Sequence, residues 1–408
     1  MTRLLLGQLG ANGDCLYATV LARQLRHDYP DAHITWAVST QCLSTVRNNP
    51  DIDETWHVPI RGWGEHEQMW RLFEREAFRR YKRGEFDKIL ISQIWPDNFQ
   101  NYDNTIRPSI LRSYGKPITV PIETVIAPTA EEQERVQRFA KAHDLVDHSH
   151  VVLFECSSKS GQSFITPEQA QLIAKHLYTQ IPDAIVILCT NLEATPEDHR
   201  TLYAGELTLR EIALLTHYCT HFIGCGSGAT VAATSIAAKP LPNIQLLVPT
   251  KGMLATFTHD FEYFGLDRRE IIEIVRADPI YIANALATMC RNGFSQAHAE
   301  FNEQIKNNFE YYRQIVQGTL LRRCRYLDAA QSLLITARRY GWTPELLRFG
   351  FEQILPHIHA DPSSVFPSVK TFSDKFRSAL TDGSVSPVDE PVQRHGGFYD
   401  EEFNNALT

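Results

Sequence analysis

The sequence predicts an α/β protein built from two Rossmann-like domains in tandem, each with a doubly wound parallel sheet. Short β-rich runs alternate with amphipathic helical stretches, and strands separated by helices indicate a parallel sheet covered on both faces. A length of 408 residues suits two or three folding units rather than one. The alternation stops near residue 145 and then starts again, so we expect the second sheet to begin there.

In the first half, the expected strands and helices follow one another closely. Leu16, Val20 and Leu25 fall on one face of a helix, as in an amphipathic helix that packs on a sheet, and Pro30 ends that helix. The strands are expected at residues 3–6, 34–38, 54–58 and 88–92, and the helices at residues 15–28 and 66–82.

A helix over residues 129–143 leads into the second half, where Thr166 and Pro167 are typical of a helix N-terminus. Strands are expected at residues 151–154, 184–189, 221–224 and 244–248, and helices at residues 167–178, 207–218 and 229–238. Beyond Asp278 the pattern is helical, and from Asp361 Pro, Ser, Gly and acidic residues indicate too little buried surface for order. We therefore expect an N-terminal domain at 1–145, a second domain at 146–277, a helical extension at 278–360 and an acidic tail at 361–408.

The composition and charge exclude several classes of protein. Hydrophobic residues make up 43% of the chain and charged residues 22%, which is typical of a globular protein and excludes a disordered or coiled-coil chain. The formal net charge is -8, so the chain has no overall attraction to nucleic acid or to anionic lipid. We expect no nucleic-acid partner.

The eight cysteines form neither a metal-binding pattern nor a disulfide framework. Reduced thiols fit a cytoplasmic protein. The start of the chain is unlike a signal peptide, because Gly, Asn and Asp interrupt its short apolar run. No run reaches the roughly 18 apolar residues of a membrane span, so we expect at most peripheral contact with a membrane.

The first candidate site is the turn after the first strand, residues 7–14. Three glycines at GxxGxxG spacing let the backbone fold tightly at the carboxyl edge of the sheet, where open α/β sheets bind ligands. A dinucleotide fingerprint has GxGxxG spacing, so a nicotinamide cofactor is disfavoured. Asp14 has two interpretations: it caps the following helix, or it is a general base that takes a proton from an acceptor hydroxyl.

Two further loops indicate an anion site in the second half. The turn at residues 222–230 contains three glycines and Ser227 at a helix start, where N–H groups and the helix dipole attract phosphate. The same residues also suit a tight packing turn between a strand and a helix. The loop at residues 155–163 supplies hydroxyl groups and Lys159, and together the two loops are a candidate diphosphate site.

The order of these motifs resembles glycosyltransferase family 9, the heptosyltransferase-like enzymes of the GT-B fold. The likeness extends over about residues 3–250 and depends on the order and spacing of several pieces. The pieces are LLGQLGANGD (residues 5–14), YPDA (29–32), ITWAV (34–38), NPDID (49–53), LTLREIA (207–213) and FIGCGSG (222–228).

The resemblance implies two domains that face each other across a cleft, with the acceptor on the N-terminal side and a nucleotide diphosphate sugar mainly on the C-terminal side. It implies an inverting transfer of heptose or another sugar, with no metal ion and no other cofactor. Under the same resemblance Asp14 is the catalytic base. The acceptor-side loop is Gly10, Asn12 and Gly13, and the donor-binding residues are Ser157, Ser158, Lys159, Asn191, Glu193, Gly226, Ser227 and Gly228.

Two positions depart from the family's pattern and leave the donor and the function open. Gly226 stands where the family commonly has Asp, and Val231 stands where it has His, which weakens ADP-heptose as the donor. The acceptor is then lipopolysaccharide core, another cell-surface or lipid-linked glycan, or a protein. The alternatives are a non-catalytic protein that binds sugar nucleotides or assists assembly, and a GT-B-type sugar-nucleotide epimerase. The sequence is compatible with a monomer and with an oligomer.

Several other residues have an ordinary structural interpretation. The HxH pairs at 148/150 and 357/359 are expected to be surface histidines rather than metal ligands. The tryptophans at 56, 63, 70 and 95 are expected in the core or the cleft wall rather than as a carbohydrate platform. The basic stretch 71–83 is expected to be a solvated helix face, with attraction to an anionic acceptor or to the inner face of a membrane as the alternative.

Overall fold

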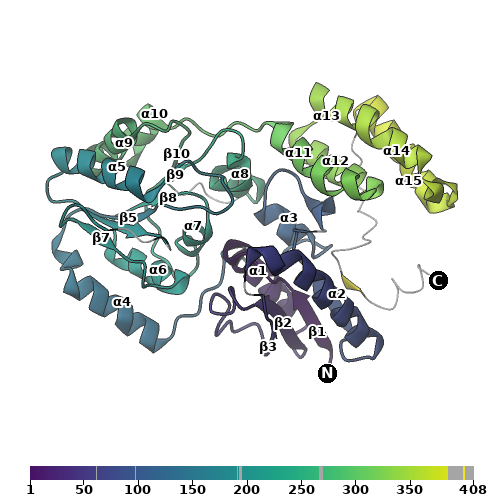
Figure 1. Ribbon diagram of the computed structural model, residues 1–408, viewed down its shortest axis with the longest axis horizontal. Helices are drawn as coiled ribbons and strands as arrows, with labels where there is room; N and C mark the ends of the chain where they lie inside the picture. Colours follow the sequence, from purple (N-terminus) through teal and green to yellow (C-terminus); the bar gives the residue numbers. More distant parts are fainter. Residues whose placement is uncertain are drawn as a thin grey trace.

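The structure is a computed structural model that describes residues 1–60, 62–96, 98–190, 192, 195–265, 270–384 and 398–399. In this part of the chain two separate sheets form, and every strand pair is parallel except one at the edge of the first sheet. The two sheets lie in different lobes, each with its own helices (Figure 1). The predicted α/β fold with two Rossmann-like domains is therefore confirmed.

The N-terminal sheet has the order β11-β4-β1-β2-β3. Leu4 and Leu6 enter the core that contains α1, whereas Leu5 enters the core on the other face, which contains α2. Residues 4–6 of β1 are all leucine and buried, as expected for a strand that is covered on both faces. The strands are β1 (Arg3–Gly7), β2 (His33–Ser39), β3 (Glu54–Val58), β4 (Lys88–Ile91) and the antiparallel edge strand β11 (Phe398–Tyr399).

The C-terminal sheet has the order β10-β9-β8-β5-β6-β7 and repeats the same design. Val152 packs in the core with α5 and α9, and Leu153 packs in the opposite core with α4 and α6. The strands are β5 (Val151–Glu155), β6 (Ile185–Cys189), β7 (Thr201–Tyr203), β8 (His221–Gly224), β9 (Asn243–Leu246) and β10 (Ile271–Ile274).

The helices of the two domains begin where their capping residues predict. Thr129, Thr166 and Thr208 each form a capping box that satisfies N–H groups at the first turn. The helices are α1 (Asn12–Asp28), α2 (His66–Lys82), α3 (Arg107–Arg112), α4 (Ala130–Ala142), α5 (Pro167–Gln180), α6 (Leu209–Leu215), α7 (Gly228–Ala232) and α8 (Phe257–Tyr263). Short 3-10 turns are η1 (Trp63–Glu65), η2 (Phe99–Asn101), η3 (Leu145–Asp147), η4 (Thr216–Tyr218) and η5 (Gly252–Leu254).

The helical region after β10 is shared between the two domains. The first two helices, α9 (Pro279–Asn292) and α10 (Phe294–Phe301), belong to the C-terminal core. The chain then crosses back, and the remaining helices pack with the N-terminal core (Figure 1). They are α11 (Phe309–Thr319), η6 (Leu321–Arg323), α12 (Tyr326–Tyr340), α13 (Pro344–Phe349), the π-helical turn η7 (Gly350–Ile354), α14 (Leu355–Ala360), η8 (Pro362–Val365) and α15 (Pro367–Asp382).

A buried ionic cluster fastens α12 to the N-terminal domain. Arg339 donates to Asp103 at 2.8 Å, Arg112 forms a second ion pair with the same carboxylate, and Ser332 donates to the Tyr102 carbonyl at 2.7 Å. Burial alone would raise the pKa of Asp103, but the two guanidinium groups outweigh it and lower the pKa to about 2. The extension is thus a brace for the first domain.

Four elements differ from the sequence expectation. Residues 367–382, expected in a tail, form α15, because Val369, Phe376 and Leu380 recur at helical spacing and pack in the N-terminal core. The helix expected at 229–238 ends at Ala232 and continues as turns. Strands β7 and β10 were not expected, since runs of three and four residues carry little periodic signal.

A second clamp joins the two domains through α6. Arg210 is buried and its guanidinium donates to the carboxylate of Glu132, at the start of α4, and to the carbonyl of Arg47 in the N-terminal domain. These bonds fix the α6 side of the C-terminal domain against the loop after β2. Among the helices that the structure describes, none has the length and apolarity of a membrane span.

Candidate active site

The carboxyl edges of the two sheets touch each other at two glycines. Gly13 lies in the first turn of α1, after β1, and Gly228 lies in the first turn of α7, after β8. A Cβ added to Gly13 would lie 3.7 Å from the Gly228 Cα and 3.5 Å from Cγ2 of Val231. At these distances a methyl group would be in ordinary van der Waals contact with the other domain, so the two turns meet closely at these glycines.

The side chain of Gln93, which follows β4, holds the turn between β1 and α1. Its Oε1 accepts hydrogen bonds from the backbone N–H groups of Leu9 and Gly10 at 2.9 and 3.0 Å and from Nε2 of Gln8 at 2.9 Å. These backbone N–H groups therefore already have a hydrogen-bond partner within the protein. The turn orients the start of α1 rather than offering a cradle for an anion.

Asp14 stands in the first turn of α1 and is partly exposed. Burial raises the pKa of its carboxyl to about 7, and a hydrogen bond from the backbone N–H of Ala11 opposes the rise only in part. This hydrogen bond to the N-cap residue agrees with the interpretation of Asp14 as part of the helix cap. The same surroundings leave a carboxyl that changes its charge near neutral pH, which is the property that a general base needs.

Cys42 connects the surroundings of Asp14 with the other domain. The charge of Asp14 raises the pKa of the Cys42 thiol, while Lys159, in the loop after β5, lowers it. Hydrogen bonds with Cys15 and Ser39 lower it further, so that on balance the pKa falls. A carboxylate of one domain and an ammonium group of the other thus act on one thiol across the contact.

His66 and Cys42 pack beside Gly10 on the N-terminal side. A Cβ at Gly10 would be in ordinary contact, 3.5 Å from Cε1 of His66 and 3.6 Å from Sγ of Cys42. The His66 ring is 5.1 Å from the ring of Trp95, and burial lowers the pKa of His66. Asn12 accepts a hydrogen bond from Thr45 at 2.9 Å. Of the predicted acceptor-side residues, Asn12 and Gly13 share the first turn of α1 with Asp14, and Gly10 lies in the turn before it.

On the C-terminal side, the carboxylate of Glu155 fills the turn that resembles an anion cradle. Glu155 ends β5 and is buried. It accepts hydrogen bonds from the backbone N–H groups of Cys225 and Ala229 at 3.0 and 2.8 Å and from Oγ of Ser227 at 2.6 Å. The N–H of Gly226 donates instead to Oγ1 of Thr230 at 3.1 Å. Most hydrogen-bond donors of this turn are therefore used within the protein, as in a tight packing turn between a strand and a helix.

The loop after β5 carries the positive charge on the donor side. Lys159 is exposed, and a Cβ added to Gly161 would lie 3.5 Å from Nζ of Lys251. Ser157 accepts a hydrogen bond from Thr190 at 2.9 Å, and Ser158 is partly exposed. The predicted Asn191 and Glu193 lie outside the described residues. Donor binding by the eight predicted residues stays a prediction.

Three of these groups were absent from the sequence expectation for the site. Glu155 and Lys251 follow strands of the sheet and so could have been found at its carboxyl edge, whereas Gln93 reaches the turn from a separate segment. No local pattern in the sequence pairs residue 93 with the turn at 8–10. Only the parallel pairing of β1 with β4 brings them together.

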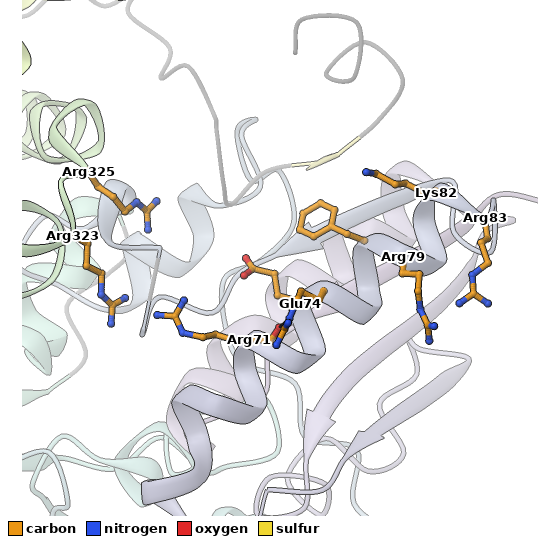
Figure 2. Close-up of a pocket in the computed structure, with 9 residues that line it drawn as sticks. Arg71, Glu74, Arg79, Lys82, Arg83, Arg323 and Arg325 are labelled. Carbon is orange, nitrogen blue, oxygen red and sulfur yellow. Dashed lines mark hydrogen bonds between the residues drawn. The ribbon is translucent and has the colours of Figure 1, made fainter. Parts of the chain in front are cut away.

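A strongly basic groove lies along α2, away from the sheet edges. It has a volume of about 830 Å³, and seven of its nine lining residues are Arg or Lys (Figure 2). Some of this charge is balanced, since Glu67 pairs with both Arg71 and Arg323 at 3.0 Å. The basic residues that line it include Arg71, Arg75, Arg79 and Lys82 on the helix and Arg323 and Arg325 from the C-terminal brace.

The tryptophans occupy the core and its border. Trp70 is fully buried, and Trp56 packs on Phe73 and under the guanidinium of Arg80 at 4.1 Å. Trp95 packs against the N-terminal core next to His66. The side chain of Trp63 lies outside the described part of the structure. The expectation of core and wall positions is confirmed for the three that are described.

No family model and no curated protein matches this chain. It is similar to a solved glycosyl transferase family 9 protein from Veillonella parvula, with 15% identity, a TM-score of 0.48, and coverage of 78% of this chain and 98% of that one. It is also similar to ADP-heptose lps heptosyltransferase II of E. coli, with 15% identity, a TM-score of 0.46, and 71% and 99% coverage. UDP-GlcNAc 2-epimerase from Neisseria meningitidis is similar at 12% identity, with a TM-score of 0.44, and 79% and 100% coverage.

The chain's own topology therefore defines its class. Two parallel sheets with their carboxyl edges face to face, and with ligand-type loops at both edges, form the GT-B arrangement of two Rossmann-like domains. To this plan the chain adds a helical brace that returns from the second domain to the first.

Proposed function

We propose that the protein is an inverting glycosyltransferase, which moves a sugar from a nucleotide diphosphate donor to a hydroxyl group of an acceptor without a metal ion. The observation that carries the proposal is the Asp14 carboxyl, whose pKa is about 7 at the point where the sheet edges meet. A group with that pKa is largely ionised just above neutral pH and still accepts a proton readily.

In the proposed reaction, ionised Asp14 takes the proton of the acceptor hydroxyl as the hydroxyl oxygen bonds to the anomeric carbon of the donor. The bond from that carbon to the diphosphate oxygen breaks on the opposite face. The configuration of the carbon is therefore inverted, and the nucleotide diphosphate leaves as an anion. Lys159 and Lys251 stabilise the charge of the leaving group, a task that a divalent ion performs in other enzymes.

The Glu155 carboxylate has a consequence for donor affinity. Because it occupies the amides of Cys225 and Ala229, the donor phosphates would be held mainly by lysine side chains. Point charges at an exposed site are screened by salt, since the Debye length is about 8 Å at physiological ionic strength. We therefore expect nucleotide binding that weakens steeply as salt is added.

We propose that the acceptor carries anionic groups and that the basic groove holds them. Helix α2 begins at His66, which lies beside Gly10 in the turn that precedes Asp14. The basic residues of α2 line the groove along the helix (Figure 2). An acceptor with its hydroxyl at Asp14 would extend along this helix. A lipid-linked glycan bound in this way would bring the protein to an anionic membrane surface. All eight cysteines are free, which supports action in the cytoplasm.

A binding measurement tests the donor side. Isothermal titration with ADP, UDP and GDP should give binding for one of them, and Lys159→Met and Lys251→Met should each weaken it about tenfold. Lys175→Met is the matched control, because Lys175 is exposed on α5, outside both loops. Equal effects at Lys159 and Lys175 would contradict the assignment of Lys159.

A second candidate function is a non-catalytic protein that binds sugar nucleotides. The occupied turn at Glu155, and glycine and valine at positions 226 and 231, favour it. Turnover separates the candidates: the wild type should release nucleotide diphosphate from a sugar donor in the presence of an acceptor, and Asp14→Asn should not. An epimerase would convert the donor sugar without an acceptor. Nucleotide binding without any turnover would support the non-catalytic function.

A further inference from the structure

We propose that His150, His221 and Cys290 form a binding site for a zinc ion on the side of the C-terminal sheet opposite to the candidate active site. His150 immediately precedes β5, and His221 is the first residue of the neighbouring parallel strand β8. Cys290 lies on α9, which packs against this sheet. One ligand atom from each residue lies within 4.8 Å of the other two.

The distances are close to those of a tetrahedral site. Sγ of Cys290 is 3.9 Å from Nδ1 of His221, and the rings of His150 and His221 are 5.8 Å apart. Zinc bonds of about 2.3 Å to sulfur and about 2.0 Å to nitrogen place those two ligand atoms about 3.6 Å apart. A small rotation of the side chains therefore closes the site, and water completes the fourth position.

The unpaired ring nitrogen of His150 is the second observation. Nδ1 of His150 is enclosed by the protein, and the structure gives it no hydrogen-bond partner among the described residues. Buried polar atoms are nearly always paired, so a ring nitrogen of this kind is an exception that needs an explanation. A metal ion between the three side chains would supply its partner.

A cysteine binds zinc as its thiolate, so the ion must displace the thiol proton of Cys290, and binding should tighten as the pH rises.

Two features lower the affinity of the site for a cation but still allow binding. Nζ of Lys239 donates to the carbonyl of Cys219 at 3.0 Å, and its positive charge repels a cation at His221. Oγ1 of Thr220 lies 2.8 Å from Nδ1 of His221, but its hydroxyl has another acceptor in the Val151 carbonyl at 3.1 Å. Imidazole and thiolate together favour Zn²⁺ over Mg²⁺ or Ca²⁺, which prefer oxygen.

Cobalt reports on this site directly, and the test does not depend on sugar transfer. The full chain, treated with a chelator and then titrated with Co²⁺, should bind about one equivalent and develop a thiolate-to-cobalt charge-transfer absorption. Cys290→Ser should abolish the absorption, and Cys324→Ser should retain it, because Cys324 is an exposed cysteine on the brace. No absorption in the wild type, or an absorption that survives Cys290→Ser, would overturn the proposal.

A second variant tests the site even if Cys290→Ser fails to fold. His150→Gln changes a partly exposed side chain and should keep the far-ultraviolet circular dichroism of the wild type. Its affinity for Zn²⁺, measured by competition with a chromophoric chelator, should fall at least about tenfold. His148→Gln is its matched control, since His148 lies two residues away and outside the cluster. An unchanged affinity in His150→Gln would also overturn the proposal.

Discussion

Asp14→Asn should stabilise the fold at pH 8 while it abolishes turnover, because the charge that the reaction needs is one that the folded protein accommodates poorly. The pKa of the carboxyl rises from 3.8 to about 7 on folding. At about 1.4 kcal/mol per pH unit, the ionised form costs the fold at most about 4 kcal/mol. Asp14 is partly exposed, so solvent screening reduces this, and we expect about 2 kcal/mol.

The raised pKa of Asp14 determines whether the stability of the wild type rises or falls with pH. Since the folded state binds the proton more tightly than the unfolded chain does, the wild type loses stability between pH 3.8 and about 7, and the loss is complete above that range. The asparagine variant has no such loss and keeps an oxygen that accepts from the Ala11 N–H. The stability advantage of Asp14→Asn should therefore be small near pH 4 and largest near pH 8.

The assay is urea unfolding followed by tryptophan fluorescence between about pH 4 and about pH 8, combined with a nucleotide diphosphate release assay. General base catalysis contributes roughly a hundred- to ten-thousandfold, so kcat/KM should fall by that amount in Asp14→Asn. In the wild type, kcat/KM should also fall as the pH drops below about 7. A variant that retains a third of the activity, or a stability advantage that does not grow with pH, would refute the reasoning.

Asp28 provides the matched control at the other end of α1. Burial alone would raise the pKa of Asp28, but hydrogen bonds from Tyr114, His27 and Gln24 together outweigh it and lower the pKa. The stabilisation from this group is present above its unfolded pKa and is lost as the pH falls. Asp28→Asn should therefore be less stable than the wild type at pH 8, the opposite sign to Asp14→Asn, with unchanged kcat/KM.

Three further predictions concern the parts that hold the site in place. Asp103→Asn leaves Arg339 without its buried counter-charge and should lower the free energy of unfolding by about 3–5 kcal/mol in urea; a loss below about 1 kcal/mol would contradict the role of the brace. Gly226→Ala should lower stability by about 2 kcal/mol in calorimetry, because φ is +66° and the new Cβ would lie 2.5 Å from a neighbouring side chain, whereas Gly228→Ala should cost less than half as much. Glu155→Gln presents an amide donor to backbone N–H groups and should cost about 1–3 kcal/mol in urea, a result that an unchanged midpoint would exclude.

The two-sheet architecture could be predicted because the decisive signals are local. The first strand contains three consecutive leucines at residues 4–6, the helices carry apolar stripes, and Thr166 with Pro167 defines a helix start within a few residues. Helix α15 was missed for the opposite reason. Its Pro- and Ser-containing surroundings resemble a tail, and its apolar face is stable only against the N-terminal core.

The electrostatics of the candidate site could not be predicted from the sequence. A carboxylate at a helix start is ordinarily a cap, and only the enclosure of Asp14 in the folded chain raises its pKa to about 7. The glycine-rich turn at residues 224–228 looks like an anion site until Glu155, about seventy residues earlier, is placed against its amides. His150 and Cys290 are likewise far apart in the sequence, and only the packing of α9 on the sheet brings them together.

By itself, the amino-acid sequence determined which segments form strands and helices, how they alternate, and which loops stand at the sheet edges, since these follow from backbone geometry and short-range apolar periodicity. The tertiary structure alone decided which charged groups are enclosed together and which amides already have a partner. Desolvation and Coulomb energies depend on distances between residues far apart in the chain, and no local pattern encodes those distances.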